Sequence, residues 1–138
     1  MIELTHKLEI NYEGDFETTA EPSKDEQFIN RVTQITEQKL SESGFGVEQL
    51  AREINLSRAH LFRKLKAIIK KSPIDFINDM RLQRAAEMIR GRVDTLGQIS
   101  YRVGFSDQSY FAKRFRRKFG ISPRRFRLDG LVQEAEQA

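Results

Sequence analysis

The stretch from Gly104 to Phe126 reads GFSDQSYFAKRFRRKFGISPRRF. Among its residues are five arginines and two lysines, five phenylalanines, one tyrosine and a single acidic side chain. Phe111 and Phe115 are spaced to lie on one face of a helix over 109–119, with the basic residues on the other faces. The pattern predicts a helix with an aromatic inner face. Its basic face is either solvated or a surface that binds a polyanion.

A related pattern occurs about 50 residues earlier in the chain. With a shift of 49 residues, segment 47–57 matches segment 96–106 in pattern, and with a shift of 50 residues segment 61–76 matches segment 111–126. Each copy predicts a short helix, a turn of three to four residues and a longer basic helix. This is the layout of a helix-turn-helix, whose second helix enters the major groove of DNA. Because the pattern occurs twice, we expect a duplicated helix-turn-helix.

Other helices are predicted around the two copies. Ser23 with Glu26, and Thr95 with Gln98, have the spacing of capping boxes that begin helices. Apolar periodicity and turn residues then predict helices over 23–41, 47–54, 58–70, 73–90, 96–103 and 109–119, and a last helix from Ser122–Pro123 to near Gly130. The fold class is therefore all-α, with about seven helices in two homeodomain-like three-helix units.

The helix over 73–90 is apolar on two sides. Ile74, Ile77 and Met80 form one side, and the other is formed by Leu82, Ala85, Ala86 and Ile89. Such a helix is either buried in one core or a bridge between two packed units. If it is a bridge, the chain divides into an acidic leader over 1–22, flexible or weakly structured, a first helix-turn-helix subdomain over 23–71, a linker helix over 72–91, a second subdomain over 92–130 and a disordered tail over 131–138.

Composition and charge narrow the possible functions. The chain has no cysteine, which excludes disulfides, cysteine–zinc sites and thiol nucleophiles, and it has no apolar run long enough to span a membrane. The net charge of +4 is uneven, since residues 1–26 carry eight acidic residues against two lysines and residues 27–138 carry 22 basic against 12 acidic residues. Such a basic body attracts phosphate backbones or anionic lipid, and charge alone does not choose between these partners. We expect no cofactor, no metal and no enzymatic activity, because the acidic residues of 57–127 lie at caps or on the linker helix.

Three segments resemble the DNA-binding domain of AraC/XylS-type transcription regulators. They are LAREINLSRAHLFRKLK (50–66), RLQRAAEMI (81–89) and ISYRVGFSDQSYFAKRFRRKFGISPRRFR (99–127), and the resemblance covers about Phe28 to Leu128. It implies two helix-turn-helix subdomains that bind double-stranded promoter DNA in the bacterial cytoplasm, in association with the nucleoid. It further implies transcription regulation, usually activation, with RNA polymerase as a second partner. The lead-in over 25–54 is similar to segments that follow receiver domains in two-component regulators, so an upstream sensor or receiver domain is a further expectation.

The base-reading positions that the resemblance implies fall on both second helices: Ala59, Phe62, Arg63, Gln108, Ser109, Ala112 and Lys113. Arg63 can bond guanine, Phe62 and Ala59 can touch thymine methyls, and Gln108 can pair with adenine. Each assignment has an alternative. Phe62 can equally pack in the core, Arg63 can be a solvated charge, and Gln108 can cap its helix. Asp107 is interpreted as a helix cap.

The remaining basic residues of these helices are assigned to phosphate contacts: Arg58, Lys64, Lys66, Arg114, Arg116, Arg117 and Lys118. Helix N-termini at Ser57, Ser72, Ser106 and Ser122 are further candidate phosphate sites. A linker helix of roughly 16 residues spans ~24 Å, less than the ~34 Å between successive major-groove turns, so simultaneous insertion predicts DNA bent toward the protein. The alternative function is a protein–protein interaction module that reads no bases.

Overall fold

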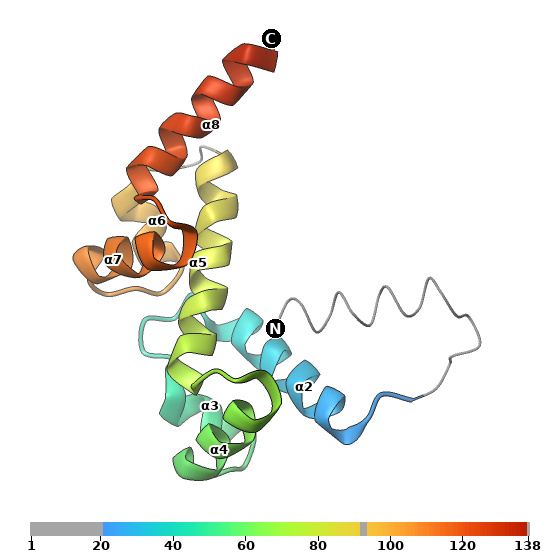
Figure 1. Ribbon diagram of the computed structural model, residues 1–138. Coiled ribbons are helices and arrows are strands. Elements are labelled where there is room, and N and C mark those ends of the chain that lie inside the picture. The colour runs from blue at the N-terminus through green and yellow to red at the C-terminus, as the bar shows by residue number, and fades with distance from the viewer. Residues whose placement is uncertain (1–20, 92–93, 138) are drawn as a thin grey trace.

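The structure, a computed structural model, describes residues 21–91 and 94–137. The expectations for the acidic leader fall almost entirely outside the described residues. The described helices are α2 (Lys24–Lys39), α3 (Val47–Glu53), α4 (Arg58–Ile69), α5 (Pro73–Gly91), α6 (Leu96–Arg102), α7 (Gln108–Phe119) and α8 (Pro123–Gln137) (Figure 1). No strand occurs in these two ranges. The predicted all-α fold is confirmed, and the described ranges hold the seven helices that the sequence predicts.

The helices begin where the capping residues predict. The Ser23 side chain accepts from the amide of Glu26 at 3.1 Å, and the Glu26 carboxylate accepts from the Ser23 amide at 3.3 Å. Thr95 and Gln98 form the same reciprocal pair at the start of α6, at 3.2 Å and 3.0 Å. Each box satisfies amides that a helix start leaves without a partner, and the loss of such a cap typically costs ~1 kcal/mol.

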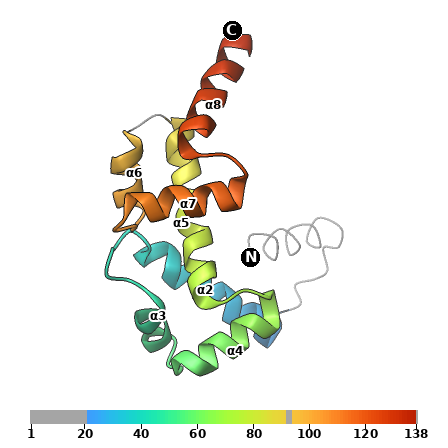
Figure 2. The ribbon, with the colours of Figure 1, turned by 60° about the vertical axis from the view of Figure 1, so that its left-hand side comes forward.

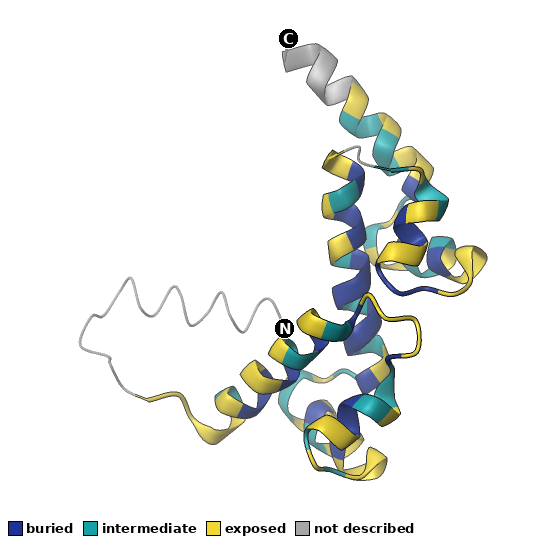
Figure 3. Ribbon diagram, turned by 180° about the vertical axis from the view of Figure 1, so that it is seen from behind, coloured by how far each residue is buried: buried dark blue, intermediate teal, exposed yellow. Residues whose placement is uncertain are grey.

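Helix α5 passes through two separate hydrophobic cores. Its N-terminal half contributes Phe76, Ile77 and Met80 to a core shared with α2, α3 and α4. Its C-terminal half contributes Leu82 and Ile89, with Ala85 and Ala86, to a core shared with α6 and α7. Figure 3 shows buried residues recurring along most of this helix, between intermediate and exposed ones, and Figure 1 shows the two helical groups that pack on it. The apolar residues on two sides of α5 therefore bridge two packed units.

The second core is built from phenylalanines. Phe111 and Phe115 are buried, and their ring centroids lie 5.8 Å apart. Phe105 lies 5.3 Å from Phe111, while Phe119 and Phe126 lie 4.5 Å and 5.5 Å from Phe115. Tilted aromatic pairs at these distances are each worth ~0.5–1.5 kcal/mol beyond the area they bury. The predicted aromatic inner face is confirmed, and these rings are not free to stack on single-stranded bases.

The prediction that Ile74 faces the core is wrong. Its side chain is 45% exposed, whereas its neighbour Pro73 is buried. The inward stripe of α5 therefore runs through Pro73, Phe76, Ile77 and Met80, at intervals of three and four residues. Ile74 lies outside this stripe, in the first turn of the helix.

The last helix does not end near Gly130 as predicted. Helix α8 runs to Gln137, so residues 131–137 are helical where a disordered tail was expected. A single interior glycine costs a helix only ~1 kcal/mol relative to alanine, and leucine, glutamine, glutamate and alanine after it are good helix formers. Figures 1 and 2 show α8 extending away from the two packed groups.

Candidate nucleic-acid interface

The first helix-turn-helix consists of α3, a tight turn and α4. Asn55 in the turn has a φ of 59°, and the following amide, that of Leu56, donates to the Ala51 carbonyl at 2.9 Å. Ser57 then caps α4 by accepting from the His60 amide at 3.0 Å. Leu61 and Leu65 are fully buried, so the inner face of α4 is occupied by the core.

The second helix-turn-helix has the same construction, and its turn is one residue longer. Gly104, at the position equivalent to Asn55, has a φ of 102°, and the Phe105 amide donates to the Ser100 carbonyl at 3.0 Å. Asp107 caps α7 and accepts from the amides of Ser109 at 2.8 Å and Tyr110 at 3.2 Å. The interpretation of Asp107 as a cap is confirmed. Its carboxylate also occupies the amides that Ser106 was expected to offer to a phosphate.

The seven predicted base-reading residues lie on the outer sides of α4 and α7. Six are exposed and Ala112 is half-buried, and the complete set is Ala59, Phe62, Arg63, Gln108, Ser109, Ala112 and Lys113. They are not brought together in one cluster, since α4 lies at the N-terminal end of α5 whereas α7 crosses α5 near its middle (Figure 2). The Gln108 side chain lies against α6. It is so close to Gly97 that a Cβ built on this glycine would lie 3.2 Å from the Gln108 Oε1.

Phe62 is not a core residue. Its side chain is 47% exposed and lies one position after Leu61, which is completely buried. A groove of about 560 Å³ lies beside the ring, between the start of α4 and the start of α5. Its lining residues are Val47, Arg58, Ala59, Phe62, Arg63, Ser72, Pro73 and Ile74. The groove therefore combines apolar lining residues with two arginines, Arg58 and Arg63.

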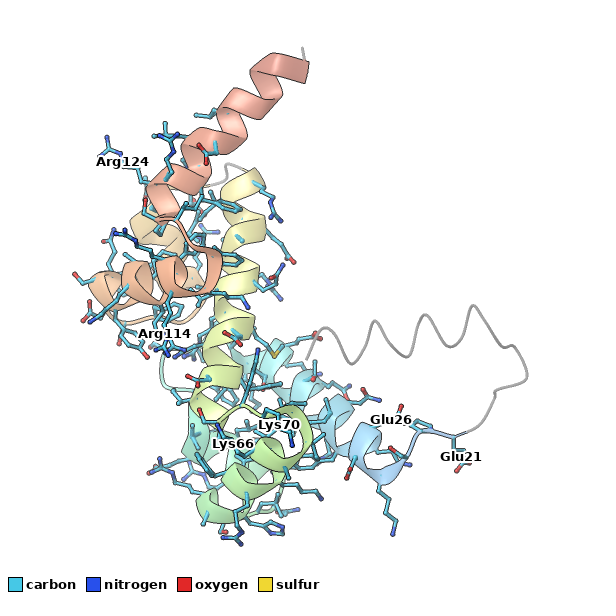
Figure 4. The ribbon with its side chains drawn as sticks, in the orientation of Figure 1. Glu21, Glu26, Lys66, Lys70, Arg114 and Arg124 are labelled. Carbon is cyan, nitrogen blue, oxygen red and sulfur yellow. The ribbon has the colours of Figure 1, made fainter. Side chains whose placement is uncertain are left out.

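The predicted phosphate contacts divide into two groups. Lys66, Arg116 and Arg117 are exposed, and Arg58 is exposed while it pairs with Glu48 at 3.4 Å. Lys64 lies over the ring of Phe28, 4.4 Å from its centroid, and Lys118 lies 3.7 Å from the Asp79 carboxylate. Arg114 is 16% exposed and bonds the Asp75 carboxylate at 2.9 Å. In Figure 4 Arg114 lies between α7 and α5, whereas Arg124 extends outward from α8.

The Asp75–Arg114 pair joins α5 to the second recognition helix. Burial alone raises the pKa of the Asp75 carboxyl, but the hydrogen bond and the positive charge of Arg114 outweigh it and lower the pKa below its ordinary value. Ser72 assists, because its hydroxyl bonds this carboxyl and also accepts from the Asp75 amide at 3.2 Å. The N-terminal amide that Ser72 was expected to offer to a phosphate is thus already bonded.

The sequence interpretation missed Arg81. This side chain is 6% exposed in the middle of α5, and it donates to the main-chain carbonyls of Leu40 at 3.0 Å, Glu42 at 3.3 Å and Phe45 at 2.9 Å. An arginine within a helix is ordinarily expected to be a solvated charge, so its partners 36 to 41 residues away could not be predicted. An arginine that interrupts the two apolar sides of a bridging helix was the available signal.

Neither a metal site nor a membrane span occurs in the part of the chain that the structure describes. Over 21–91 and 94–137, no three histidine or carboxylate side chains come together in a group that could hold a metal ion. No helix within these ranges is both long and apolar enough to cross a membrane. The two exposed recognition helices therefore remain the candidate site in this part of the chain.

Comparisons with known proteins agree with this geometry. A family model described as "Helix-turn-helix domain" matches residues 50–129. A protein named histidine kinase P4, from Formosa agariphila, is 36% identical over 104 residues, which is 75% of this chain and 8% of that protein. The HTH-type transcriptional activator RhaS from Escherichia coli is 36% identical over 88 residues, 62% of this chain and 32% of RhaS. The chain thus spans about a third or less of these curated relatives.

Among solved structures, the C-terminal domain of AraT, a response regulator from Geobacillus stearothermophilus, superposes with a TM-score of 0.70. The two are 28% identical, and the match covers 78% of this chain and 88% of that domain. The arrangement of two helix-turn-helix units on one linker helix is therefore shared with a domain from a regulatory protein.

Proposed function

Because this chain belongs to the AraC-type helix-turn-helix family, we propose that it binds a specific sequence of double-stranded DNA and regulates transcription there. The observation that carries this proposal is that α4 and α7 each turn a buried face inward and an exposed polar or basic face outward. Such a pair supplies two recognition helices from one chain. The net positive charge of residues 27–138 supplies the attraction to phosphates.

We propose that the two helices read different base chemistry. On α4, Phe62 and Ala59 present apolar surface to thymine methyls, and Arg63 donates to the O6 and N7 of guanine. On α7, Gln108 pairs with adenine, while Ser109, Ala112 and Lys113 complete the polar surface. The groove beside Phe62 supports this assignment, since a half-exposed ring next to Arg63 is placed to take up a methyl group.

The exposed cations are proposed to hold the DNA backbone. Lys66, Arg116 and Arg117 are accessible to phosphates, and so is Arg58, whose pair with Glu48 is itself exposed. Lys64, Arg114 and Lys118 contact groups of the first subdomain or of α5. Phosphate contacts position a protein on the duplex without reading its sequence. We therefore expect the first group to contribute more to the salt dependence of binding than the second.

The separation of the two helices bears on the shape of the bound DNA. Helix α5 has 19 residues and so spans ~28 Å, still less than the ~34 Å between successive major-groove turns. We propose that simultaneous insertion of α4 and α7 bends the DNA toward the protein, at a cost of a few kcal/mol. Electrophoresis of duplexes carrying the site at different positions tests this, because unbent DNA with both helices bound contradicts it.

The larger setting is also a proposal. The names of the relatives, a histidine kinase, a transcriptional activator and a response regulator, support the view that this domain is the output part of a cytoplasmic, nucleoid-associated regulator. In that setting an upstream sensor or receiver domain delivers the signal, RNA polymerase is the second partner, and activation is the expected direction.

Selection from random-sequence duplexes tests the central proposal. The chain is expected to enrich one bipartite sequence, with two half-sites about one helical turn apart. Binding to that duplex should weaken steeply with salt, with a slope of about −0.9 in log K per phosphate contact. If no sequence is enriched and binding is insensitive to salt, the chain is a protein interaction module and the proposal fails.

A further inference from the structure

The Arg81 guanidinium anchors α5 to the first subdomain from inside the molecule. Its three hydrogen bonds end on Leu40, Glu42 and Phe45, which lie between the end of α2 and the start of α3. Each of these partners is a neutral main-chain carbonyl, lying 36 to 41 residues away in sequence. A buried guanidinium with planar, fixed donors holds such carbonyls in one arrangement.

The same guanidinium also touches the second subdomain. It lies over the Phe105 ring, 6.0 Å from its centroid, in the turn between α6 and α7. The neighbouring Gly104 is packed so tightly that a Cβ there would overlap the Leu40 carbonyl oxygen and lie 2.7 Å from the Arg81 Nε. The Leu40 carbonyl, Arg81 and the Gly104–Phe105 turn therefore meet at one point, which we call the junction.

Helix α7 is tied to the first half of α5 at a second place. The Tyr110 hydroxyl accepts from the Asn78 side chain at 3.1 Å, and Arg114 bonds Asp75 at 2.9 Å. Asp75 and Asn78 belong to the half of α5 that packs in the first core. The second recognition helix is thus held to the first subdomain both through its turn, at the junction, and along its own length.

We propose that Arg81 is a positioning residue that fixes the distance and orientation between α4 and α7, so that the chain measures the spacing between its two DNA half-sites. This inference rests on the proposed DNA binding. Arg81 touches no DNA itself, because it is buried beneath both subdomains. Two binding units held rigidly at the matching distance bind a bipartite site far more tightly than either unit binds alone, and loosening them removes part of that gain.

Spacing variants of the selected duplex provide the measurement. One base pair added or removed between the half-sites shifts the second by ~3.4 Å and rotates it by roughly 35°. The wild-type chain is expected to lose roughly tenfold or more in affinity for either variant, because a rigid junction cannot follow this change. A wild-type chain that binds all three spacings within roughly twofold would overturn the inference without any mutant.

Arg81→Lys keeps the positive charge and removes the planar set of donors. We expect it to bind the bipartite duplex roughly tenfold more weakly, to bind an isolated half-site within roughly twofold of wild type, and to have a flatter dependence on spacing. Arg84→Lys is the matched control, since Arg84 is exposed on the same helix, and it should keep the wild-type spacing profile.

A role in stability alone predicts a different result. In that case Arg81→Lys weakens half-site and bipartite binding equally, or leaves the spacing profile unchanged, and either outcome overturns the inference. If Arg81→Lys does not fold, as judged by circular dichroism, Phe105→Leu takes its place, because it removes the ring beneath the guanidinium. The same half-site affinity, bipartite affinity and spacing profile are then measured for Phe105→Leu. If wild type selects no DNA sequence at all, the proposed function fails first, which separates the two failures.

Discussion

The exposed position of Phe62 leads to a quantitative prediction about Phe62→Ala. The ring is 47% exposed, so roughly 100 Å² of a side chain that offers 150–250 Å² is still open to water. If DNA covers this area, the ceiling of the gain is about 2.5 kcal/mol at ~25 cal/mol per Å². Because binding costs reduce that gain, we expect Phe62→Ala to weaken binding of the selected duplex roughly 5- to 50-fold.

The effect on folding should be small by comparison. A fully buried Phe→Ala change costs ~3–5 kcal/mol because it leaves a cavity, whereas Phe62 borders an open groove. We expect Phe62→Ala to lower the free energy of unfolding by about 1–1.5 kcal/mol. Leu61→Ala, at the adjacent and completely buried position, should cost ~2–5 kcal/mol. Urea denaturation followed by circular dichroism measures both.

Uracil in place of thymine tests the contact itself. The substitution removes only the C5-methyl group from the major groove, so wild type should bind the uracil duplex more weakly. Phe62→Ala should bind the thymine and uracil duplexes equally, because the partner of the methyl is gone. The interpretation is refuted if Phe62→Ala destabilises the fold as much as Leu61→Ala does while the folded fraction keeps its affinity for DNA.

Three further predictions follow from the caps and charges. Asp107→Ala leaves the amides of Ser109 and Tyr110 without their partner, so thermal unfolding should show a loss of about 1 kcal/mol, and Asp107→Asn, which can still cap, should lose less. Because the pKa of Asp75 is lowered in the fold, its pair with Arg114 stabilises the fold above the unfolded-state pKa of ~3.9, and this stabilisation is lost as the pH falls through the folded-state pKa. Denaturation between pH 6 and pH 2 should therefore show a smaller loss of stability for Asp75→Asn than for wild type. Equal losses of stability would contradict this prediction. Arg116→Ala should weaken binding of all DNA sequences alike and reduce the salt slope by about 0.9, with no change in the preferred sequence in a competition assay.

Local sequence determined the helices and the inner faces of most of them. The capping pairs Ser23–Glu26 and Thr95–Gln98 mark helix starts because their hydrogen bonds span only three residues. The spacing of Phe111 and Phe115 predicts their burial because helical periodicity alone puts them on one face. Local rules were insufficient at the ends of elements, where Gly130 suggests a stop that the helix-forming residues after it override.

Tertiary structure alone decided what covers each remaining helix face. Phe62 and Arg114 lie on the two basic helices and Arg81 lies on α5. Periodicity shows on which side of its helix each residue lies, but not what is packed there. Arg81 is buried because carbonyls 36 to 41 residues away meet it, and Arg114 is engaged because Asp75, 39 residues away, lies beside it. Phe62 is exposed because no segment packs over the groove between α4 and α5 within the described residues. Contacts over such separations depend on how the two subdomains fold against α5, and so no local pattern encodes them.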